Sequence, residues 1–374
     1  MKVTLIFPDS VTTPTGGLGV QFKNLYTRLK HKIDFQVVGQ PDTPDNIVDK
    51  YKSAIHPIPV IKHGSINTLI GYTEYLKEAF KYPKPDIVHA HDWSTYYTGV
   101  CLAEVYNVPL LVSINLSSNA LANLGLYSCS DFSTEDGKWL HKTHVELEWY
   151  GLKKANKIIT VSNGYSNYFP TFRDKTVIIP NGIDLNEWQP TELIKLPGDR
   201  KHKVVYIGRL TSMKSINELL DATIPDDVDL IIVGALTGGD FQSIHKLASL
   251  VNNKPGLHYY GPAYDQHKIN LLYSVDAIVM PSKHEPFGIV ALEALASRNI
   301  LLSSRIDGLG DFLTNENSIY TGTTPESISE ALFKFTQMSD EEKINMVKNG
   351  LNTCLNYNWD DIAEQYYDVY KSLV

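Results

Sequence analysis

The chain has 374 residues, of which 43% are hydrophobic and 20% charged, and its formal net charge is −8. These values are typical of globular proteins and exclude disordered and fibrous classes. At about 150 residues per domain the length predicts two to three domains. An acidic chain without a long basic run is also a poor candidate for binding nucleic acid through phosphates.

The cysteines and the N-terminus indicate the compartment. Cys101, Cys129 and Cys354 are odd in number, far apart and not in CxxC spacing, which argues against a disulfide framework or a zinc site. The five residues Val3–Phe7 before Pro8 are too few for a signal peptide, and no later apolar run reaches membrane length. We therefore expect a cytoplasmic protein.

Short apolar runs alternate with amphipathic stretches along the chain, and the alternation restarts after Pro180-Asn181-Gly182. The predicted strands are Val3–Phe7, Asp34–Val38, Asp86–His89, Leu110–Ile114, Lys157–Val161, Lys203–Ile207, Asp229–Val233, Leu257–Tyr260, Asp276–Met280 and Ile300–Ser303. The predicted helices include Val20–Lys30, Ser94–Tyr106, Asn217–Ala222 and Ile289–Ala296. Continuous apolar runs separated by helices indicate buried parallel strands, and therefore two Rossmann-like, doubly wound α/β domains.

The predicted domain boundaries follow from this restart. Residues 1–183 would form the first domain and residues 184–355 the second, with residues 356–374 as a final helix rich in Tyr and Trp. Residues 1–180 carry a net charge of +2 and residues 181–374 a net charge of −10, so the two halves have different surfaces. Ligands of such sheets bind beyond the carboxyl ends of the strands, and we expect a site between the domains.

A glycine-rich turn, Thr15-Gly16-Gly17-Leu18-Gly19, follows the first strand and precedes a helix. Glycines there let the backbone approach a ligand, and the helix N-terminus attracts an anion. In a dinucleotide fingerprint that begins at Gly17, the third glycine would stand where Phe22 stands, so binding of NAD is disfavoured.

The segment His89-Ala90-His91-Asp92-Trp93 ends another predicted strand, at the edge where ligands bind. A zinc site would need further ligands, and neither CxxC nor HExxH is present. The alternative to a functional role is that one histidine is buried and satisfied while the other caps the next helix.

The strongest pattern is Asp276–Met280 followed by Lys283-His284-Glu285-Pro286-Phe287-Gly288 and a helix that contains Glu293. Glu285 precedes the helix and can accept hydrogen bonds from sugar hydroxyls, whereas Glu293, about two turns further on, can meet a second polyol such as a ribose. Between them the amides of Gly288, Ile289 and Val290 would face a diphosphate. Two ordinary helix carboxylates would be the alternative, but apolar residues surround the pair.

Arg209 and Lys214 follow the first strand of the second half, in Gly208-Arg209-Leu210-Thr211-Ser212-Met213-Lys214. Two cations there could hold a leaving diphosphate, and solvated loop charges are the alternative. Two other matches are set aside. Asp227-Val228-Asp229 matches a metal-binding DxD motif, but it precedes its predicted strand, which is the wrong end for a ligand site. Asn115-Leu116-Ser117 matches a glycosylation acceptor, which has no meaning without secretion.

The motifs of this chain resemble those of the GT-B glycosyltransferases in content and order, over nearly the whole chain. They are GGLG, HAHDW, PNGID, GRL followed by Lys214, and EPFGIVALEA. The likeness is to the retaining nucleotide-sugar enzymes of family 4, which are related to the glycogen and starch synthases. It implies that a nucleotide sugar carrying UDP, ADP or GDP is the substrate and that a glycan or other hydroxyl compound is the acceptor. It also implies that no metal and no cofactor take part, and that any membrane contact is at most peripheral.

The resemblance also implies residue roles. Arg209, Lys214 and Glu285 would be catalytic. The donor would contact Gly17, Asn115, Gly261, Phe287, Gly288, Ile289, Val290 and Glu293. The first domain would bind the acceptor through His91, Asp92 and Trp93, and the final helix would cross back onto that domain.

Two departures from the family pattern set the limits of this likeness. Relatives carry a histidine by the donor sugar where this chain has Asn115, which suggests a different sugar or an altered contact. The synthases carry a lysine where this chain has Pro14, which moves the prediction away from glycogen or starch synthesis. A nucleotide-sugar 2-epimerase of the same fold and an inactive sugar-nucleotide-binding relative are the alternatives.

Overall fold

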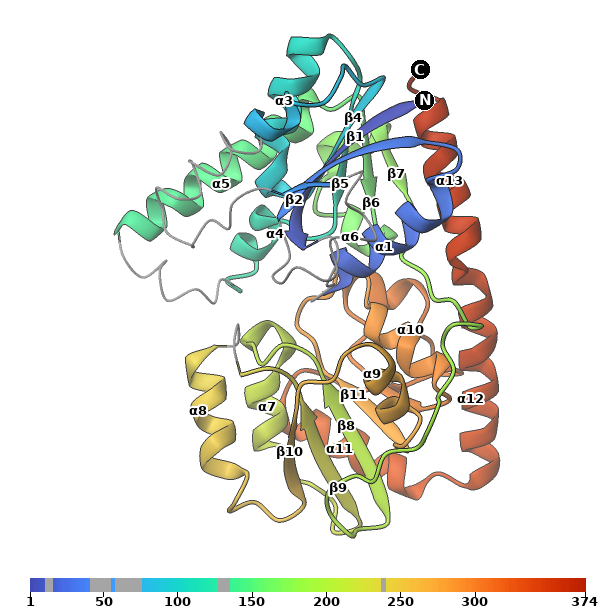
Figure 1. Cartoon of the computed structure of the whole chain (residues 1–374). Coiled ribbons are helices and arrows are strands. Elements are labelled where there is room, and N and C mark those ends of the chain that lie inside the picture. The colour runs from blue at the N-terminus through green and yellow to red at the C-terminus, as the bar shows by residue number, and fades with distance from the viewer. Residues whose placement is uncertain (11–15, 41–54, 58–75, 127–134, 237–239) are drawn as a thin grey trace. The chain divides into compact units, whose positions relative to one another are not determined.

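The chain folds into two units, Met1–Asn181 with Trp359–Val374, and Gly182–Asn358. The structure is a computed structural model that describes residues 1–10, 16–40, 55–57, 76–126, 135–236 and 240–374 (Figure 1). The first unit therefore contains the chain's last helix. The sequence analysis placed the divisions after residues 183 and 355.

The first unit contains a seven-stranded sheet in the order β3-β2-β1-β4-β5-β6-β7, in which every pair is parallel. Its strands are β1 (Lys2–Ser10), β2 (Asp34–Gln40), β3 (Ile55–Pro57), β4 (Ile87–His91), β5 (Leu110–Ile114), β6 (Lys157–Thr160) and β7 (Thr176–Ile178). All five residues of β4 and all five of β5 are buried. Burial on both faces explains why these strands appear in the sequence as unbroken runs rather than as alternating patterns.

Helices surround this sheet: α1 (Gly17–Leu29), α3 (Trp93–Tyr106), α4 (Ser118–Asn123), α5 (Glu135–Lys154), α6 (Asn163–Ser166) and α13 (Trp359–Lys371). The last helix, α13, packs against α1, and α3 packs against α5. Trp359, Ile362, Tyr366 and Tyr370 on α13 are buried in the same core cluster as Val3 of β1. The final helix, rich in Tyr and Trp, therefore contributes to the core of the first unit.

The second unit repeats the same winding, with a parallel sheet in the order β10-β9-β8-β11-β12-β13. Its strands are β8 (His202–Ile207), β9 (Val228–Val233), β10 (Leu257–Gly261), β11 (Ala277–Met280), β12 (Ile300–Ser303) and β13 (Ile319–Tyr320). Its helices are α7 (Ile216–Asp221), α8 (Phe241–Leu250), α9 (Asp265–Leu272), α10 (Ile289–Ala296), α11 (Pro325–Gln337) and α12 (Asp340–Cys354). In each sheet the strand order reverses beside the first strand of the unit, between β1 and β4 and between β8 and β11. Such sheets bind ligands at this position.

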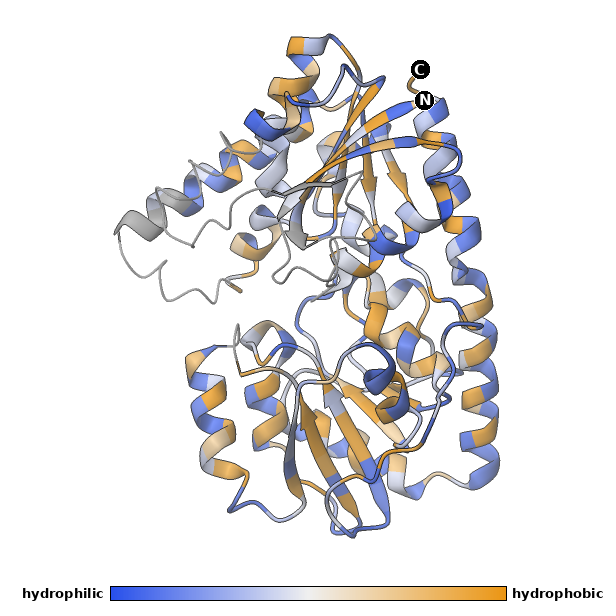
Figure 2. Ribbon diagram, in the orientation of Figure 1, coloured by the Kyte–Doolittle hydropathy of each residue, from blue (hydrophilic) through white to orange (hydrophobic). Residues whose placement is uncertain are grey.

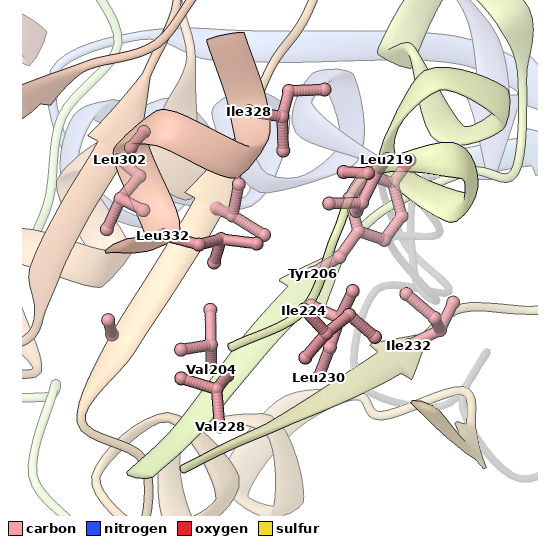
Figure 3. Packing of buried hydrophobic residues seen from close by; sticks show 14 of the residues in the cluster. Val204, Tyr206, Leu219, Ile224, Val228, Leu230, Ile232, Leu302, Ile328 and Leu332 are labelled. Carbon is pink, nitrogen blue, oxygen red and sulfur yellow. The ribbon is translucent and has the colours of Figure 1, made fainter. Parts of the chain in front are cut away.

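The core of the second unit lies between this sheet and the helices on it. Figure 3 shows Val204 of β8 near Leu332 of α11 and Leu230 of β9 near Ile224, and all four residues belong to one buried cluster. In Figure 2 the strands of the second unit are mainly hydrophobic, whereas most helices alternate hydrophilic and hydrophobic residues. This distribution is what burial of a sheet beneath amphipathic helices requires. In the part of the chain that the structure describes, no helix is long and apolar enough to cross a membrane.

Candidate active site

The loops after β8 and β11 bring Lys214 and Glu285 together in the second unit. Lys214 closes a 3₁₀ turn (Ser212–Lys214), and its Nζ forms an ion pair with Oε2 of Glu285. The two residues are 71 positions apart in the sequence, but β8 and β11 are neighbours in the sheet and their carboxyl ends share an edge. The side chains are 17% and 13% exposed, so the pair is accessible but largely desolvated.

Asp307 fixes the backbone of Glu285. The N–H of Glu285 donates to Oδ2 of Asp307 at 3.0 Å, and Nδ1 of the fully buried His284 lies 2.6 Å from the same oxygen. Asp307 itself has a positive φ of 47° in the turn after β12. The sequence analysis did not identify Asp307, because nothing in its local pattern separates it from an ordinary turn residue.

The helix α10 begins four residues after Glu285, at Ile289. Gly288 precedes it with a φ of 98°, and a Cβ atom at this position would lie 2.3 Å from Cδ2 of Leu309. Only glycine satisfies both conditions. The N–H groups at the start of a helix have no partner within the helix and carry its partial positive charge, so the amides of Gly288, Ile289 and Val290 can bind an anion.

Glu293 lies inside α10 and is 3% exposed. Lys268 of α9 forms an ion pair with its Oε1. Its other carboxylate oxygen, Oε2, is buried and has no hydrogen-bond partner among the described residues. A buried carboxylate oxygen without a donor is costly, and a ligand hydroxyl would satisfy it.

Arg209 and Gly261 lie at the same edge of the second sheet. Arg209 follows β8; its side chain is exposed, and its carbonyl accepts a hydrogen bond from the Tyr206 hydroxyl at 2.5 Å. Gly261 ends β10 with a φ of 97°, and its carbonyl accepts from the N–H of Gly234 at 3.0 Å. A Cβ atom on Gly234 would lie 2.3 Å from the carbonyl oxygen of Gly208, so the chain passes closely over itself here.

Phe287 occupies the core rather than the surface of this edge. Its side chain is 3% exposed and its ring lies 5.4 Å from that of Phe312 and 5.7 Å from that of Tyr357. The side chain therefore supports the loop that carries Glu285, and it packs against the protein.

In the first unit, Asp92 organises the ends of β4 and β5. Its φ is 59°, and its Oδ1 accepts from the N–H of Asn115 at 2.7 Å and of Leu116 at 3.1 Å. The side-chain Nδ2 of Asn115 is buried without a partner among the described residues. Asp92 and Asn115 are thus brought together, whereas the other predicted donor residues, apart from Gly17, belong to the second unit.

The two histidines before Asp92 are buried and neutral. His89 hydrogen-bonds through Nδ1 to the Tyr370 hydroxyl at 2.7 Å and through Nε2 to the Ser113 hydroxyl at 2.8 Å. Burial, with a smaller contribution from His91, lowers the pKa of His89 well below its usual range, and burial lowers the pKa of His91 to about 3. His89 therefore matches the alternative of a buried, satisfied histidine.

Trp93 begins α3, and two residues that the sequence analysis missed, both on α5, complete this region. The ring of His144 lies 4.2 Å from that of Trp93, and burial lowers the His144 pKa to about 4. Glu148 is fully buried, and its Oε2 accepts from the N–H of Asn119 at 3.0 Å. Burial outweighs this hydrogen bond and raises the pKa of Glu148 to about 7. Their only sequence signal was a polar residue on the buried face of a helix.

Gly17 begins α1 and is exposed, as is Gly16 before it. Thr15 and Pro14 lie outside the described residues. Within the described ranges, no group of three or more His, Cys, Asp and Glu residues could hold a metal ion.

Family models match almost the whole chain. The model described as Glycosyltransferase Family 4 covers residues 15–187, and the model described as Glycosyl transferases group 1 covers residues 193–353. The chain therefore belongs to the glycosyltransferases, with the family 4 domain in its first half and the group 1 domain in its second half. An uncharacterised glycosyltransferase of Methanocaldococcus jannaschii is 28% identical over 99% of this glycosyltransferase and 98% of its own length. The alpha-maltose-1-phosphate synthase of Mycolicibacterium smegmatis is 24% identical over the full length of both.

Solved structures share the fold of this glycosyltransferase. Sucrose-phosphate synthase from Thermosynechococcus elongatus superposes with a TM-score of 0.81 at 20% identity, over 99% of this chain and 98% of that one. HepE from Anabaena, in complex with UDP-glucose, superposes with a TM-score of 0.74 at 17% identity, over 99% and 100%. The predicted fold class, two doubly wound parallel sheets of the GT-B type, is confirmed.

Proposed function

We propose that this glycosyltransferase moves a sugar from a nucleoside diphosphate donor to a hydroxyl of a carbohydrate acceptor, with retention of anomeric configuration and without a metal ion. The second unit would bind the donor and the first unit the acceptor. The observation that carries the proposal is the Lys214–Glu285 pair directly before the N-terminus of α10.

The charges at this edge suit a departing diphosphate. When the donor's glycosidic bond breaks, negative charge gathers on the phosphate oxygens. Arg209 is exposed and available to them, and Lys214, whose ammonium has three donors, keeps two after pairing with Glu285. The amides at the start of α10 add fixed positive dipoles, and preorganised groups of this kind stabilise developing charge without reorganising. These fixed charges would do the work for which other enzymes use a metal.

Glu285 and Glu293 would position the two polyols of the donor. Glu285, 13% exposed and oriented by Asp307, would accept hydrogen bonds from the donor sugar. Glu293, with one carboxylate oxygen unpartnered, would accept from the nucleotide ribose. The family resemblance attributes retention to attack on the same face of the sugar assisted by the leaving phosphate, so no carboxylate nucleophile is needed.

The edge of the first sheet suits an acceptor rich in hydroxyls. Asp92 can accept from a hydroxyl, Trp93 offers an aromatic face, and His91 is neutral. We propose His91, Asp92 and Trp93 as acceptor-side residues and Asn115 as a contact to the donor sugar. Cys101 and Cys354 are free thiols. Because thiols stay reduced in the cytoplasm, this supports our proposal that the reaction takes place there.

A donor panel tests the proposal directly. UDP-, ADP- and GDP-sugars would be incubated with the purified enzyme, with and without maltooligosaccharides, glucose and sugar phosphates, and the released nucleotide measured. Acceptor-dependent release from one donor is expected. Free epimerised sugar without a transfer product would instead establish the epimerase, and nucleotide binding without turnover would establish an inactive relative.

Stereochemistry and metal dependence need separate measurements on the same reaction. Proton NMR of the first product should show the anomeric configuration of the donor, and an inverted product would overturn the assignment of retention. Activity should persist in excess EDTA after dialysis, and loss that Mg²⁺ or Mn²⁺ restores would show that the fixed cations do not suffice.

A further inference from the structure

Lys268 binds the carboxylate of Glu293 from a neighbouring helix. Its Nζ forms an ion pair with Oε1 of Glu293, and its side chain is 21% exposed, against 3% for Glu293. Lys268 lies on α9 and Glu293 on α10, 25 positions later. Nothing in the sequence of the helix Asp265–Leu272 indicates this contact.

A second contact holds Lys268 in place. Its ammonium lies 5.4 Å from the centre of the Trp188 ring, within the range of a cation–π interaction. The indole N–H of Trp188 donates to Oγ of Ser297 at 2.7 Å, and the carbonyl of Trp188 accepts from the Tyr273 hydroxyl at 3.0 Å. The ring that faces Lys268 is therefore fixed at both its side chain and its backbone.

The arrangement leaves one carboxylate oxygen without a donor, which distinguishes it from a structural ion pair. The same unit contains such a structural pair, Lys203 with Asp229. Both oxygens of Asp229 are used, by Lys203 at 2.5 Å and Arg200 N at 2.9 Å on Oδ2, and by His258 at 2.9 Å on Oδ1. Glu293 is equally buried, yet its Oε2 has no partner in the described part of the chain.

We propose that Lys268 is a positioning residue for nucleotide recognition. It neutralises Glu293 and holds its carboxylate so that Oε2 accepts a hydrogen bond from a ribose hydroxyl of the donor. This inference rests on the proposed function, because it requires a nucleoside diphosphate at this edge. Lys268 thereby sets how strongly the site distinguishes a ribose from a sugar that lacks its hydroxyls.

The consequence of removing Lys268 follows from the burial of Glu293. Without its ammonium the carboxylate would be a buried charge with no counter-ion, and it would rotate toward water or take up a proton. Either response withdraws Oε2 from the ribose. If Lys268 had a purely structural role, its removal would weaken the binding of all nucleotides equally. If it positions Glu293, its removal would weaken the binding of nucleotides with ribose hydroxyls more than the binding of nucleotides without them.

Calorimetry on the full-length enzyme tests this difference. UDP, ADP and GDP would be titrated into wild type to find the one that binds, and its 2′,3′-dideoxy form would then be titrated. Wild type should bind the dideoxy form roughly 10-fold more weakly or worse, the loss expected for a hydrogen bond to a charged group. In Lys268→Met the ratio of the two dissociation constants, dideoxy form over parent nucleotide, should fall to less than about 3-fold, mainly because the parent nucleotide binds more weakly.

Two further variants complete the test. Lys268→Arg keeps the charge and the stacking on Trp188, and it should restore most of the discrimination. Lys246→Met removes another lysine–carboxylate pair of the same unit, with Asp221, and should bind like wild type. An unchanged ratio in Lys268→Met, or tighter binding of the parent nucleotide, would overturn the positioning role. No binding of any of the three nucleotides to wild type would instead refute the proposed function.

Discussion

The two units have the same strand order at their centres and very different chemistry at the carboxyl ends of their strands. In the second unit that edge is charged, with Lys214 on Glu285, Lys268 on Glu293, and Arg209 exposed. In the first unit, burial shifts the pKa values of several side chains near that edge toward their neutral forms. His91 and His144 have pKa values lowered by burial, and Glu148 has a pKa raised by burial to about 7.

We propose that this difference lets one scaffold serve two kinds of ligand. Fixed charges at a helix start suit a diphosphate, whose charge grows as it leaves. Neutral rings, amides and a protonatable carboxyl suit hydroxyl groups, which both donate and accept. The net charge of each half does not reveal the distinction, since the unit that we propose binds the donor lies in the more acidic part of the chain, residues 181–374, with a net charge of −10.

The largest expected effect comes from removing Glu285 or Arg209 at the charged edge of the second unit. Glu285→Ala and Arg209→Ala should each lower kcat about 10²–10³-fold, because each removes a group aimed at the reacting sugar or the leaving diphosphate. Steady-state kinetics with circular dichroism checks this. Lys283→Ala, which breaks the neighbouring pair with Glu218 instead, should retain activity. Wild-type turnover in folded Glu285→Ala would remove Glu285 from the mechanism.

The raised pKa of Glu148 in the first unit predicts that the stability of the protein falls as pH rises. The folded pKa of Glu148, about 7, lies above its ordinary value of 4.5. Its contribution to stability is therefore complete below the unfolded pKa and is lost as pH rises through about 7, by up to roughly 3 kcal/mol. Glu148→Gln cannot ionise, so its free energy of unfolding should fall less than that of wild type between about pH 5 and pH 8.

Urea denaturation at several pH values measures this change. Glu146→Gln, an exposed change on the same helix, is the matched control and should follow wild type. Parallel pH curves for wild type and Glu148→Gln would show that Glu148 is ionised in the folded protein. The first unit would then carry a buried charge, and the contrast between the units would weaken.

A smaller effect separates stability from donor binding. Tyr370→Phe removes the hydroxyl that hydrogen-bonds His89 and leaves a buried ring nitrogen unpaired, which should cost about 1–3 kcal/mol. Nucleotide affinity should not change, because this contact lies in the first unit. Urea denaturation and calorimetry on the same sample measure both quantities. A loss of nucleotide affinity equal to the loss of stability would show that the two edges are not independent.

The sequence predicted the architecture well because buried parallel strands leave unbroken apolar runs. The predicted Leu110–Ile114 and Ile300–Ser303 coincide with β5 and β12. It missed β3, β7 and β13, which have three, three and two residues and are too short to form a run. It ended one strand at His89, but β4 continues to His91, because burial of neutral imidazoles overrides their polar character.

At the site, the sequence predicted residues whose neighbours along the chain carry a pattern and missed those defined by contacts across the fold. Glu285 and Gly288 stand in a strand–loop–helix motif, and the structure places them as that motif requires. Lys268 and Glu148 belong to ordinary helical patterns, and only packing against another element shows that each is tied to a site. Phe287 stands in the motif as well, yet its side chain packs in the core.

Hydrogen exchange with and without the bound nucleoside diphosphate tests most directly whether the second unit binds the donor. Peptides covering residues 208–214, 261–264 and 285–293 should gain protection, and peptides covering residues 89–93 and 141–148 should not. Protection confined to the first unit would contradict the assignment of the donor to the charged edge.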